Sequence, residues 1–334
     1  VCDGIFDRGT IKIELRPNVS IDEKTGSVSS SKGSGQKFDM EYIGSGAVFS
    51  FDMYVFIDDD KQREAVENAF TILVGEEAQL GAKKSSGAGR FVASSIKRIV
   101  YDLKTAEGRA AWGNEEDDDC FEDISLVANQ KTQYKYVVTV DGVTEGPILI
   151  KGIGVNGYGQ DNPDSANMRN SKGEYIIPGT SIRGVLRAQM ERISSYLGAD
   201  KVIESASGVM AAQHKDSHKG NLIFSDITIG EIEDNDLNPI RHRIHIDKLT
   251  GGVINGQLFS EKNAAGRLKN FVINIQDEYN PDAVLGLLLY ALRDMSIHTM
   301  NLGGGFSIGK GFVNVEKISV RCHTKESTIN MVDG

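Results

Sequence analysis

The chain has 334 residues, of which 40% are hydrophobic and 25% charged, and this balance excludes a wholly disordered, collagen-like or coiled-coil protein. Its length predicts two domains or one large core. The net charge of −10, from 37 Lys and Arg against 47 Asp and Glu, disfavours a nucleic-acid ligand unless basic residues gather locally. Ten of the 47 acidic residues lie in two clusters, 58–60 and 115–123.

Three cysteines, Cys2, Cys120 and Cys322, lie far apart and form no CxxC pair, which argues against a disulfide framework and a zinc ribbon. The longest apolar run, 283–292, is about half of the roughly 20 residues that cross a bilayer. We therefore expect a cytoplasmic protein with no membrane span and no export leader.

An internal repeat divides the chain. Residues 16–26 (RPNVSIDEKTG) are echoed by 241–251 (RHRIHIDKLTG), and both fit R-x5-D-x2-T-G. Because apolar alternation predicts strands and helical spacing predicts helices, each copy continues with the same series of elements. The series is a strand (47–56; 268–275), a helix (65–73; 283–295), a glycine-rich turn (80–91; 302–312) and a strand (91–99; 312–320).

The second copy has a preface that the first lacks. It comprises strands over 134–140 and 148–152, a loop over 153–175 and a helix over 182–197. The resulting order of strand, helix, strand, strand, helix, strand predicts an α+β fold with ferredoxin-like or RRM-like domains in tandem. The first domain is then the later half only, its other half having been cleaved, lying outside this sequence or coming from a neighbouring chain. We divide the chain into domains 1–105 and 134–334, joined by an acidic linker, 106–133.

A phosphate-binding surface is predicted at the start of the helix over 182–197. Pro178-Gly-Thr-Ser181 begins the helix, and Arg183, Arg187 and Arg192 follow at about one-turn intervals. Free backbone amides at a helix start, together with guanidinium groups, attract phosphate. The alternative is an ordinary capped helix with an exposed basic face.

The glycine-rich turns are a second candidate for phosphate binding. Glycines allow a backbone to approach a ligand closely, and basic residues supply charge. The residues concerned are Lys83, Lys84, Arg90, Gly304, Gly305 and Lys310. The alternative is a tight strand connection. Neither turn has the GxxxxGK[ST] pattern or follows a strand in a parallel βαβ unit, which excludes nucleoside triphosphate and dinucleotide cofactors.

The loop before this helix carries Asp161 and Asp164, which could place a divalent ion or orient a ribose 2′-hydroxyl, although such residues also serve turns. Two histidine pairs, His214 with His218 and His242 with His245, are favoured as solvated or packed side chains, and we predict no resident metal site. Ser and His occur without a GxSxG elbow, so a serine hydrolase has no support.

With IPGTSIRGVLR (177–187), LIFSD (222–226), the R-x5-D-x2-T-G segment and LGGGFSIGKGF (302–312) in one order, residues 134–320 resemble the RAMP superfamily of CRISPR-associated proteins. More narrowly, they resemble a type III backbone subunit. Residues 16–99 resemble the later half of another such domain. The resemblance implies a modified RRM fold and subunits that stack along a guide CRISPR RNA together with other effector subunits.

The resemblance also implies a thumb-like hairpin in each domain, at 247–261 and 22–41, with Asp22, Asp247, Thr250 and Phe259 as thumb residues. Guide binding would use phosphates and riboses, to which we assign Lys83, Lys84, Arg90, Ser181, Arg183, Arg187, Gly304, Gly305 and Lys310.

In active members an aspartate before the IPG motif is needed to cut target RNA with a divalent metal such as Mg²⁺ or Mn²⁺. Asp164 matches that position best and Asp161 is the alternative. Two other functions stay open: a non-catalytic structural RNA-binding subunit, and a metal-independent guide-processing ribonuclease with His242 or His245 as general base.

Overall fold

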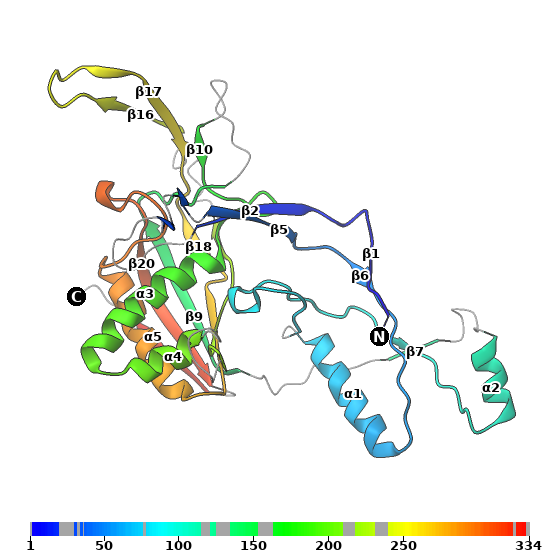
Figure 1. The fold of residues 1–334 in the computed structure, drawn as a ribbon. Coiled ribbons are helices and arrows are strands. Elements are labelled where there is room, and N and C mark those ends of the chain that lie inside the picture. The colour runs from blue at the N-terminus through cyan, green and yellow to red at the C-terminus, as the bar shows by residue number, and fades with distance from the viewer. Residues whose placement is uncertain are drawn as a thin grey trace. The chain divides into compact units, whose positions relative to one another are not determined.

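The computed structural model describes residues 2–19, 30–31, 34–35, 37–75, 78–114, 121–124, 134–152, 163–209, 218–230, 240–322 and 325–331 (Figure 1). The chain forms two compact units. The larger unit contains Val1–Tyr54, Ser85–Gly87 and Tyr134–Gly334, and the smaller unit contains Val55–Lys84 and Ala88–Gln133.

A large antiparallel sheet organises the larger unit around β9 (Tyr134–Glu145). One edge of β9 pairs with β18 (Arg267–Lys269) and β19 (Val272–Gln276), and the other pairs with β20 (Phe312–Cys322). Four strands extend the sheet on its two sides: β11 (Tyr175–Ile177), β14 (Leu222–Phe224), β15 (Ile227–Gly230) and β21 (Lys325–Asn330). The spatial order through β9 is therefore β20, β9, β19, β14.

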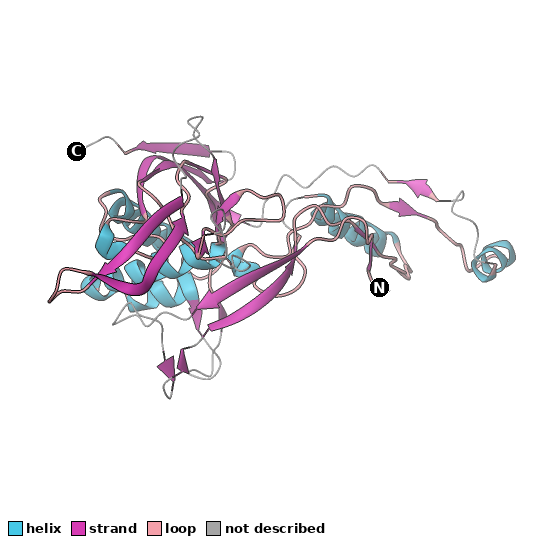
Figure 2. Cartoon of the chain, turned by 90° about the horizontal axis from the view of Figure 1, so that it is seen from above, coloured by secondary structure: helices cyan, strands magenta, loops and turns pink. Residues whose placement is uncertain are grey.

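Three helices cover this sheet: α3 (Gly179–Leu197), α4 (Asp200–Ser207) and α5 (Pro281–Ser296). Ile182, Leu186 and Met190 lie at four-residue intervals on α3 and are fully buried, as the helical period requires for one apolar face. Val138 and Val140 alternate on β9 and enter the same core. Figure 2 shows the helices of this unit gathered together. The core fixes the position of the start of α3.

Two hairpins belong to the larger unit. β16 (Ile240–Ile246) pairs with β17 (Val253–Lys262), and β2 (Ile13–Val19) pairs with β5 (Lys37–Ile43). The β16–β17 hairpin projects beyond the sheet (Figure 1). Short pairs complete the unit: β1 (Ile5–Phe6) with β6 (Phe49–Ser50), β3 (Ser30–Ser31) with β4 (Ser34–Gly35), β12 (Gly208–Val209) with β13 (His218–Lys219), and β10 (Ser165–Ala166) with β17.

The smaller unit contains α1 (Asp60–Val74), α2 (Ala106–Gly113) and the pair β7 (Lys97–Arg98) with β8 (Glu122–Asp123). The Asp59 side chain caps α1 by accepting a hydrogen bond from the Gln62 amide at 2.8 Å. Neither helix has a buried residue. Within 55–75, 78–84, 88–114 and 121–124, Ala78 is the one buried hydrophobic side chain.

The two glycine-rich turns share one backbone conformation, which supports the internal repeat. The Leu80 amide donates to the Gly89 carbonyl at 2.8 Å, and the Leu302 amide donates to the Gly311 carbonyl at the same distance. Each turn contains a 3-10 helix, η1 (Lys84–Ser86) or η3 (Phe306–Ile308). Positive φ angles recur at matched positions: Gly81 and Gly303, Lys83 and Gly305, Gly87 and Gly309, Gly89 and Gly311.

The α+β class is confirmed, and the three expected helices form, but several expected strands do not. Of 47–56 only Phe49–Ser50 is a strand, and of 91–99 only Lys97–Arg98 is one. In the second copy the equivalent strands β19 and β20 both pair with β9, and the described part of the first copy has no strand in the place of β9. The segment 148–152 makes only isolated bridges, and 268–275 is interrupted at Asn270, whose φ is 61°. In the first copy, alternating apolar residues therefore did not produce the expected strands, because no neighbouring strand was available to pair with them.

Candidate nucleic-acid interface

The loop before α3 is tied to the base of the β16–β17 hairpin through Asp164. Its Oδ2 accepts hydrogen bonds from the Ser260 amide at 2.6 Å and the Ser260 hydroxyl at 3.1 Å. The Asp164 amide in turn donates to the Ser260 Oγ at 3.0 Å. The next residues form β10, which runs parallel to β17. Asp164 is exposed, and its Oδ1 makes no hydrogen bond to a described residue.

These contacts keep the Asp164 carboxylate ionised. The Ser260 amide, and then its hydroxyl, hold the pKa of Asp164 below its usual value, and His242 adds a smaller electrostatic contribution. His242 lies opposite Ser260 across the hairpin. Because the Ser260 amide points to Asp164 and away from β16, this is a non-hydrogen-bonded pair, in which facing side chains are closest. Asp164, Ser260 and His242 thus form one polar cluster.

Asn167 holds together the two ends of the same loop, and the sequence analysis did not single out this residue. The buried side chain accepts from the Ile150 amide at 2.8 Å and donates to the Met168 and Ile176 carbonyls at 3.2 Å. It therefore joins the chain before and after the loop. An asparagine in a polar loop gives the same sequence signal as a turn former, so its burial could not be foreseen.

Lys310 lies inside the protein, although the sequence suggested a phosphate ligand. The side chain is 3% exposed, and its Nζ donates to Glu261 Oε2 and, at 3.1 Å, to Asn263 Oδ1. Arg243 also pairs with Glu261, at 3.3 Å. The lysine thus joins the second glycine-rich turn to β17. A phosphate could reach Lys310 only by displacing Glu261.

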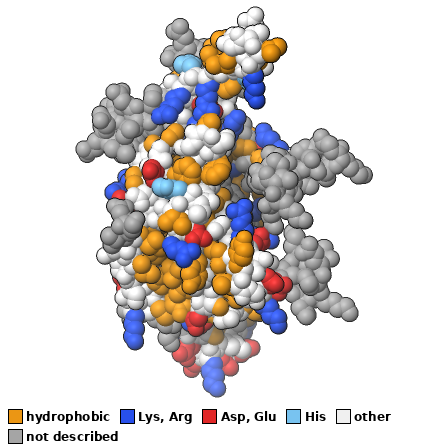
Figure 3. Space-filling model, turned by 90° about the vertical axis from the view of Figure 1, so that its left-hand side faces the viewer, with side chains coloured by type: hydrophobic (Ala, Val, Ile, Leu, Met, Phe, Trp, Pro, Cys, Tyr) orange, Lys and Arg blue, Asp and Glu red, His pale blue; other side chains and the backbone are white. Residues whose placement is uncertain are grey.

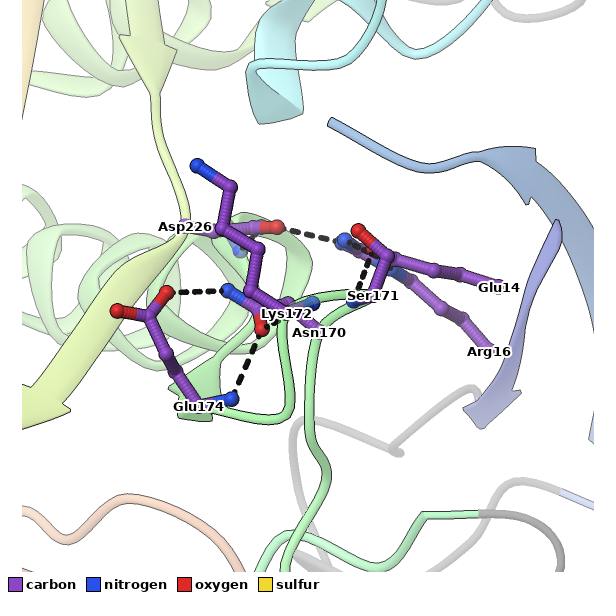
Figure 4. Close-up of polar contacts among 8 residues, drawn as sticks. Glu14, Arg16, Asn170, Ser171, Lys172, Glu174 and Asp226 are labelled. Atoms are coloured by element: carbon purple, nitrogen blue, oxygen red, sulfur yellow. Dashed lines mark hydrogen bonds and ion pairs between the residues drawn. The ribbon is translucent and has the colours of Figure 1, made fainter. Parts of the chain in front are cut away.

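The start of α3 is already occupied by a carboxylate. Asp226 Oδ1 accepts from the Gly179 amide at 2.8 Å, and its Oδ2 accepts from Arg16 Nη1 at 2.6 Å. Arg16 also binds Glu14, whose Oε1 accepts from the Ser171 amide at 2.6 Å (Figure 4). Burial alone would raise the pKa of Glu14, but the hydrogen bonds from Arg16 and Ser171 outweigh it and lower the pKa.

A second part of the first copy also contacts this helix start. Arg183 Nη1 donates to the Ser85 Oγ at 2.6 Å, and burial lowers the Arg183 pKa. A Cβ on Gly87 would lie 2.5 Å from the Phe224 carbonyl oxygen, and one on Gly179 would lie 2.6 Å from the Ser86 carbonyl oxygen. Only glycine fits such close approaches.

The other residues that the sequence predicted to bind phosphate or RNA belong to several different elements. Lys83, Lys84 and Arg90 are exposed side chains of the smaller unit. Arg187 is exposed and pairs with Glu191 at 2.6 Å. Ser181 is half-buried, Gly304 is exposed and Gly305 is half-buried. Asp161, Asp22 and His214 lie outside the described residues.

The β16–β17 hairpin carries exposed apolar and basic side chains. Asp247 fixes its turn by accepting from the Thr250 and Leu249 amides, which lower the pKa of Asp247. Exposed hydrophobic residues follow both strands: Ile244, Ile246, Leu249, Val253, Leu258 and Phe259. Arg241 and Lys248 are exposed beside them. Figure 3 shows hydrophobic, basic and histidine side chains together at the top of the molecule.

The described residues contain no group of three or more His, Cys, Asp or Glu that could hold a metal ion. Mg²⁺ commonly binds through one or two carboxylates, with water and substrate phosphates completing its shell. Asp164 is an exposed carboxylate and has the chemistry that such a shell requires. No helix among the described residues is long and apolar enough to span a membrane.

A family model described as the RAMP superfamily matches residues 10–92 and 146–314. Each matched block contains one hairpin and one glycine-rich turn, and the second also contains Asp164 and the start of α3. No curated protein matches the chain.

Proposed function

Because the chain belongs to the RAMP superfamily, we propose that it is a guide-RNA-binding backbone subunit of a type III CRISPR effector. The observation that carries the proposal is the family match in two blocks, each containing most of one copy of the repeat. RAMP proteins work in CRISPR complexes with RNA and other subunits. Support for a ferredoxin-like, RRM-like core comes from the sequential order β9, α3, β14, β19, α5, β20 and the spatial order β20, β9, β19, β14.

In this proposal the guide is bound through its phosphates and riboses, since a backbone subunit must accept any spacer sequence. We assign this contact to basic side chains that are exposed in the structure: Lys83, Lys84, Arg90 and Arg187. We assign the thumb role to β16–β17, with β2–β5 as its counterpart. Leu249 and Phe259, which are exposed on the same hairpin as Arg241, could contact bases while Arg241 contacts a phosphate.

We further propose that Asp164 takes part in cutting target RNA. Its lowered pKa makes it a poor general base, which favours orienting the ribose 2′-hydroxyl or holding a divalent ion. When bound, Mg²⁺ or Mn²⁺ would stabilise the charge that develops on the phosphate. Ser260 would keep the carboxylate directed to one place, and the hairpin would bring Ser260 there.

The test is cleavage of labelled complementary RNA by the assembled, guide-loaded complex in Mg²⁺ or Mn²⁺. Asp164→Ala should abolish cutting and leave guide binding intact, whereas Asp141→Ala, a change at an exposed aspartate of β9, should leave both cutting and guide binding intact. Unchanged cutting by Asp164→Ala would contradict the assignment, and Asp161→Ala would be tested next. Cutting that continues in EDTA would point instead to the metal-independent ribonuclease.

A non-catalytic structural role is the second candidate. It is favoured by the two Ser260 hydrogen bonds that already occupy Asp164 Oδ2 and by the single carboxylate that the described residues place in this cluster. A guide-loaded complex that binds complementary RNA tightly, yet leaves it whole with either metal, would establish this role.

A further inference from the structure

Among the described residues, Lys310 is the one lysine or arginine that is buried. Its Nζ donates to Glu261 Oε2 and to Asn263 Oδ1. The Glu261 side chain is 14% exposed, and Arg243 is its second partner. A buried charge is costly unless it is paired. Lys310 therefore holds the base of the β16–β17 hairpin, defined here as residues 260–264, to the second glycine-rich turn.

The backbone of this turn leaves the Lys310 side chain little freedom. The Gly304 amide donates to the Leu149 carbonyl at 2.9 Å, and the Lys310 amide donates to the Gly305 carbonyl at 3.1 Å. A Cβ on Gly305, whose φ is 91°, would lie only 2.9 Å from the Lys310 Cδ. The glycine therefore leaves the space that the lysine stem fills, and the stem extends from an anchored backbone.

The base of the hairpin is held on its other face by the candidate site. Ser260 and Glu261 are neighbours on β17, and because side chains alternate along a strand they lie on opposite faces. On one face the Ser260 amide and hydroxyl donate to Asp164, and on the other Glu261 accepts from Lys310. A displacement of Glu261 would therefore move the Ser260 amide that holds the Asp164 carboxylate.

The first copy of the repeat has neither charge of this ion pair. Lys310 corresponds to Ala88, since each precedes the glycine that closes its turn. Glu261 corresponds to Met40, since each lies opposite the arginine of its repeat. A pair that only stabilised the turn or the hairpin would be expected in both copies. It occurs in the copy whose hairpin contacts Asp164, which indicates a role at the candidate site.

We propose that Lys310 is a positioning residue of the candidate site. By holding Glu261 and Asn263 it fixes the base of the hairpin, and the fixed strand presents the Ser260 amide and hydroxyl to the Asp164 carboxylate. Lys310 is buried, so it acts through β17 and not on the RNA. The inference rests on the proposed function in one respect, that Asp164 takes part in cutting target RNA.

Hydrogen exchange tests the link between Lys310 and Ser260 without any cutting. Lys310→Met removes the charge and keeps an unbranched stem, and Glu261 retains Arg243, so the variant should stay folded. In the guide-loaded complex the Ser260 amide should exchange at least about tenfold faster than in the unaltered complex. Lys317→Met, the same change on β20, should leave that exchange within about twofold. Unchanged Ser260 exchange in Lys310→Met would overturn the inference.

Single-turnover cutting of complementary RNA tests the consequence at Asp164. At saturating target, Lys310→Met should slow cutting at least about tenfold, with target affinity within about twofold of the unaltered complex. Glu261→Gln keeps an oxygen that can accept from Lys310, so it should cut faster than Glu261→Ala. A rate unchanged by Lys310→Met, or a loss confined to target affinity, would contradict the proposal.

A double variant separates positioning from a general loss of stability. All variants are compared at a temperature at which far-UV circular dichroism shows them folded. Because Lys310→Met and Ser260→Ala weaken the same contact with Asp164, together they should slow cutting by less than the product of their separate effects. The full product would mean that Lys310 acts independently of Ser260, which would overturn the proposal.

The outcomes distinguish this inference from the proposed function. If the unaltered complex leaves target RNA whole, the cutting role of Asp164 fails and this inference fails with it. If the unaltered complex cuts, and the Lys310→Met complex cuts equally fast, the proposed function stands and this inference alone is wrong.

Discussion

The helices α1 and α5 occupy matching places in the two copies of the repeat, yet their surroundings differ. α5 buries Val284, Leu288 and Leu292 among its core residues, and α1 buries none. The apolar spacing is similar, but in the second copy α5 packs against α3 and against the sheet strands β9, β19 and β20. An amphipathic pattern thus predicts a helix, and burial depends on a second layer being present.

The largest expected contrast is in core stability. Leu288→Ala should lower the free energy of unfolding by about 3 kcal/mol, because it leaves a cavity around a fully buried side chain. Ile72→Ala on the half-exposed face of α1 should cost less than about 1 kcal/mol. Urea unfolding followed by far-UV circular dichroism compares the two. Equal costs would show that α1 is packed as tightly as α5.

The next largest contrast is between the two arginines of the repeat, Arg16 and Arg241, in the free energy of unfolding that is lost when each is replaced. Arg16→Ala removes the partner of Asp226 and Glu14 and should cost about 2 kcal/mol, a value reduced from that of a fully buried pair because Asp226 is partly exposed. Arg241→Ala should cost less than about 0.5 kcal/mol in the isolated chain. The same unfolding assay measures both. A large cost for Arg241→Ala would mean that its side chain is held within this chain.

The two hairpins also differ in their contacts, because Ser260 of β17 hydrogen-bonds to Asp164 in the loop before α3. In the assembled complex Ser260→Ala should slow single-turnover cutting roughly tenfold by removing a hydrogen bond to the carboxylate, with target affinity unchanged. Ser260→Thr keeps the hydroxyl and should restore the rate, and Ser319→Ala on β20 is the matched control. A rate unchanged by Ser260→Ala would remove Ser260 from the site.

The smallest effect is a dependence of stability on pH. The folded-state pKa of Glu14 lies below the usual value of a glutamate, so its contribution to stability is full above the unfolded-state pKa and is lost as the pH falls through the folded-state pKa. The unaltered chain should therefore lose more stability on going from neutral pH to about pH 3.5 than Arg16→Ala does. Urea midpoints at the two pH values give this difference. Parallel losses would contradict the role of Arg16.

Local patterns predicted α1, α3 and α5, the repeat and the α+β class, because periodicity and glycine positions are properties of short segments, but α4 was not predicted and α2 lies in the segment interpreted as a linker. The partners of the basic residues were not predictable in the same way. Arg183 and Lys310 look like free cations in the sequence, and in the structure they bind Ser85 and Glu261. Arg16 and Asp226 are separated by 210 positions, so no local pattern joins them.

The residues of the candidate site were only partly predictable, again because local sequence patterns do not show contacts between distant segments. Asp164 was singled out because it precedes the helix start in a polar loop. In the structure it hydrogen-bonds to Ser260, and its catalytic role stays a prediction. Ser260 and Asn167 gave no signal, since their roles depend on the pairing of β10 with β17 and on burial. Their discovery required the strands to be placed in space.

The most direct test of the central claim is analysis of nucleic acid that copurifies with the assembled complex. The account predicts RNA of one or a few discrete lengths, protected from added ribonuclease and lost when the exposed basic residues Lys83, Lys84 and Arg90 are replaced together by glutamate. A complex that purifies without RNA, and binds none when RNA is supplied, would contradict it.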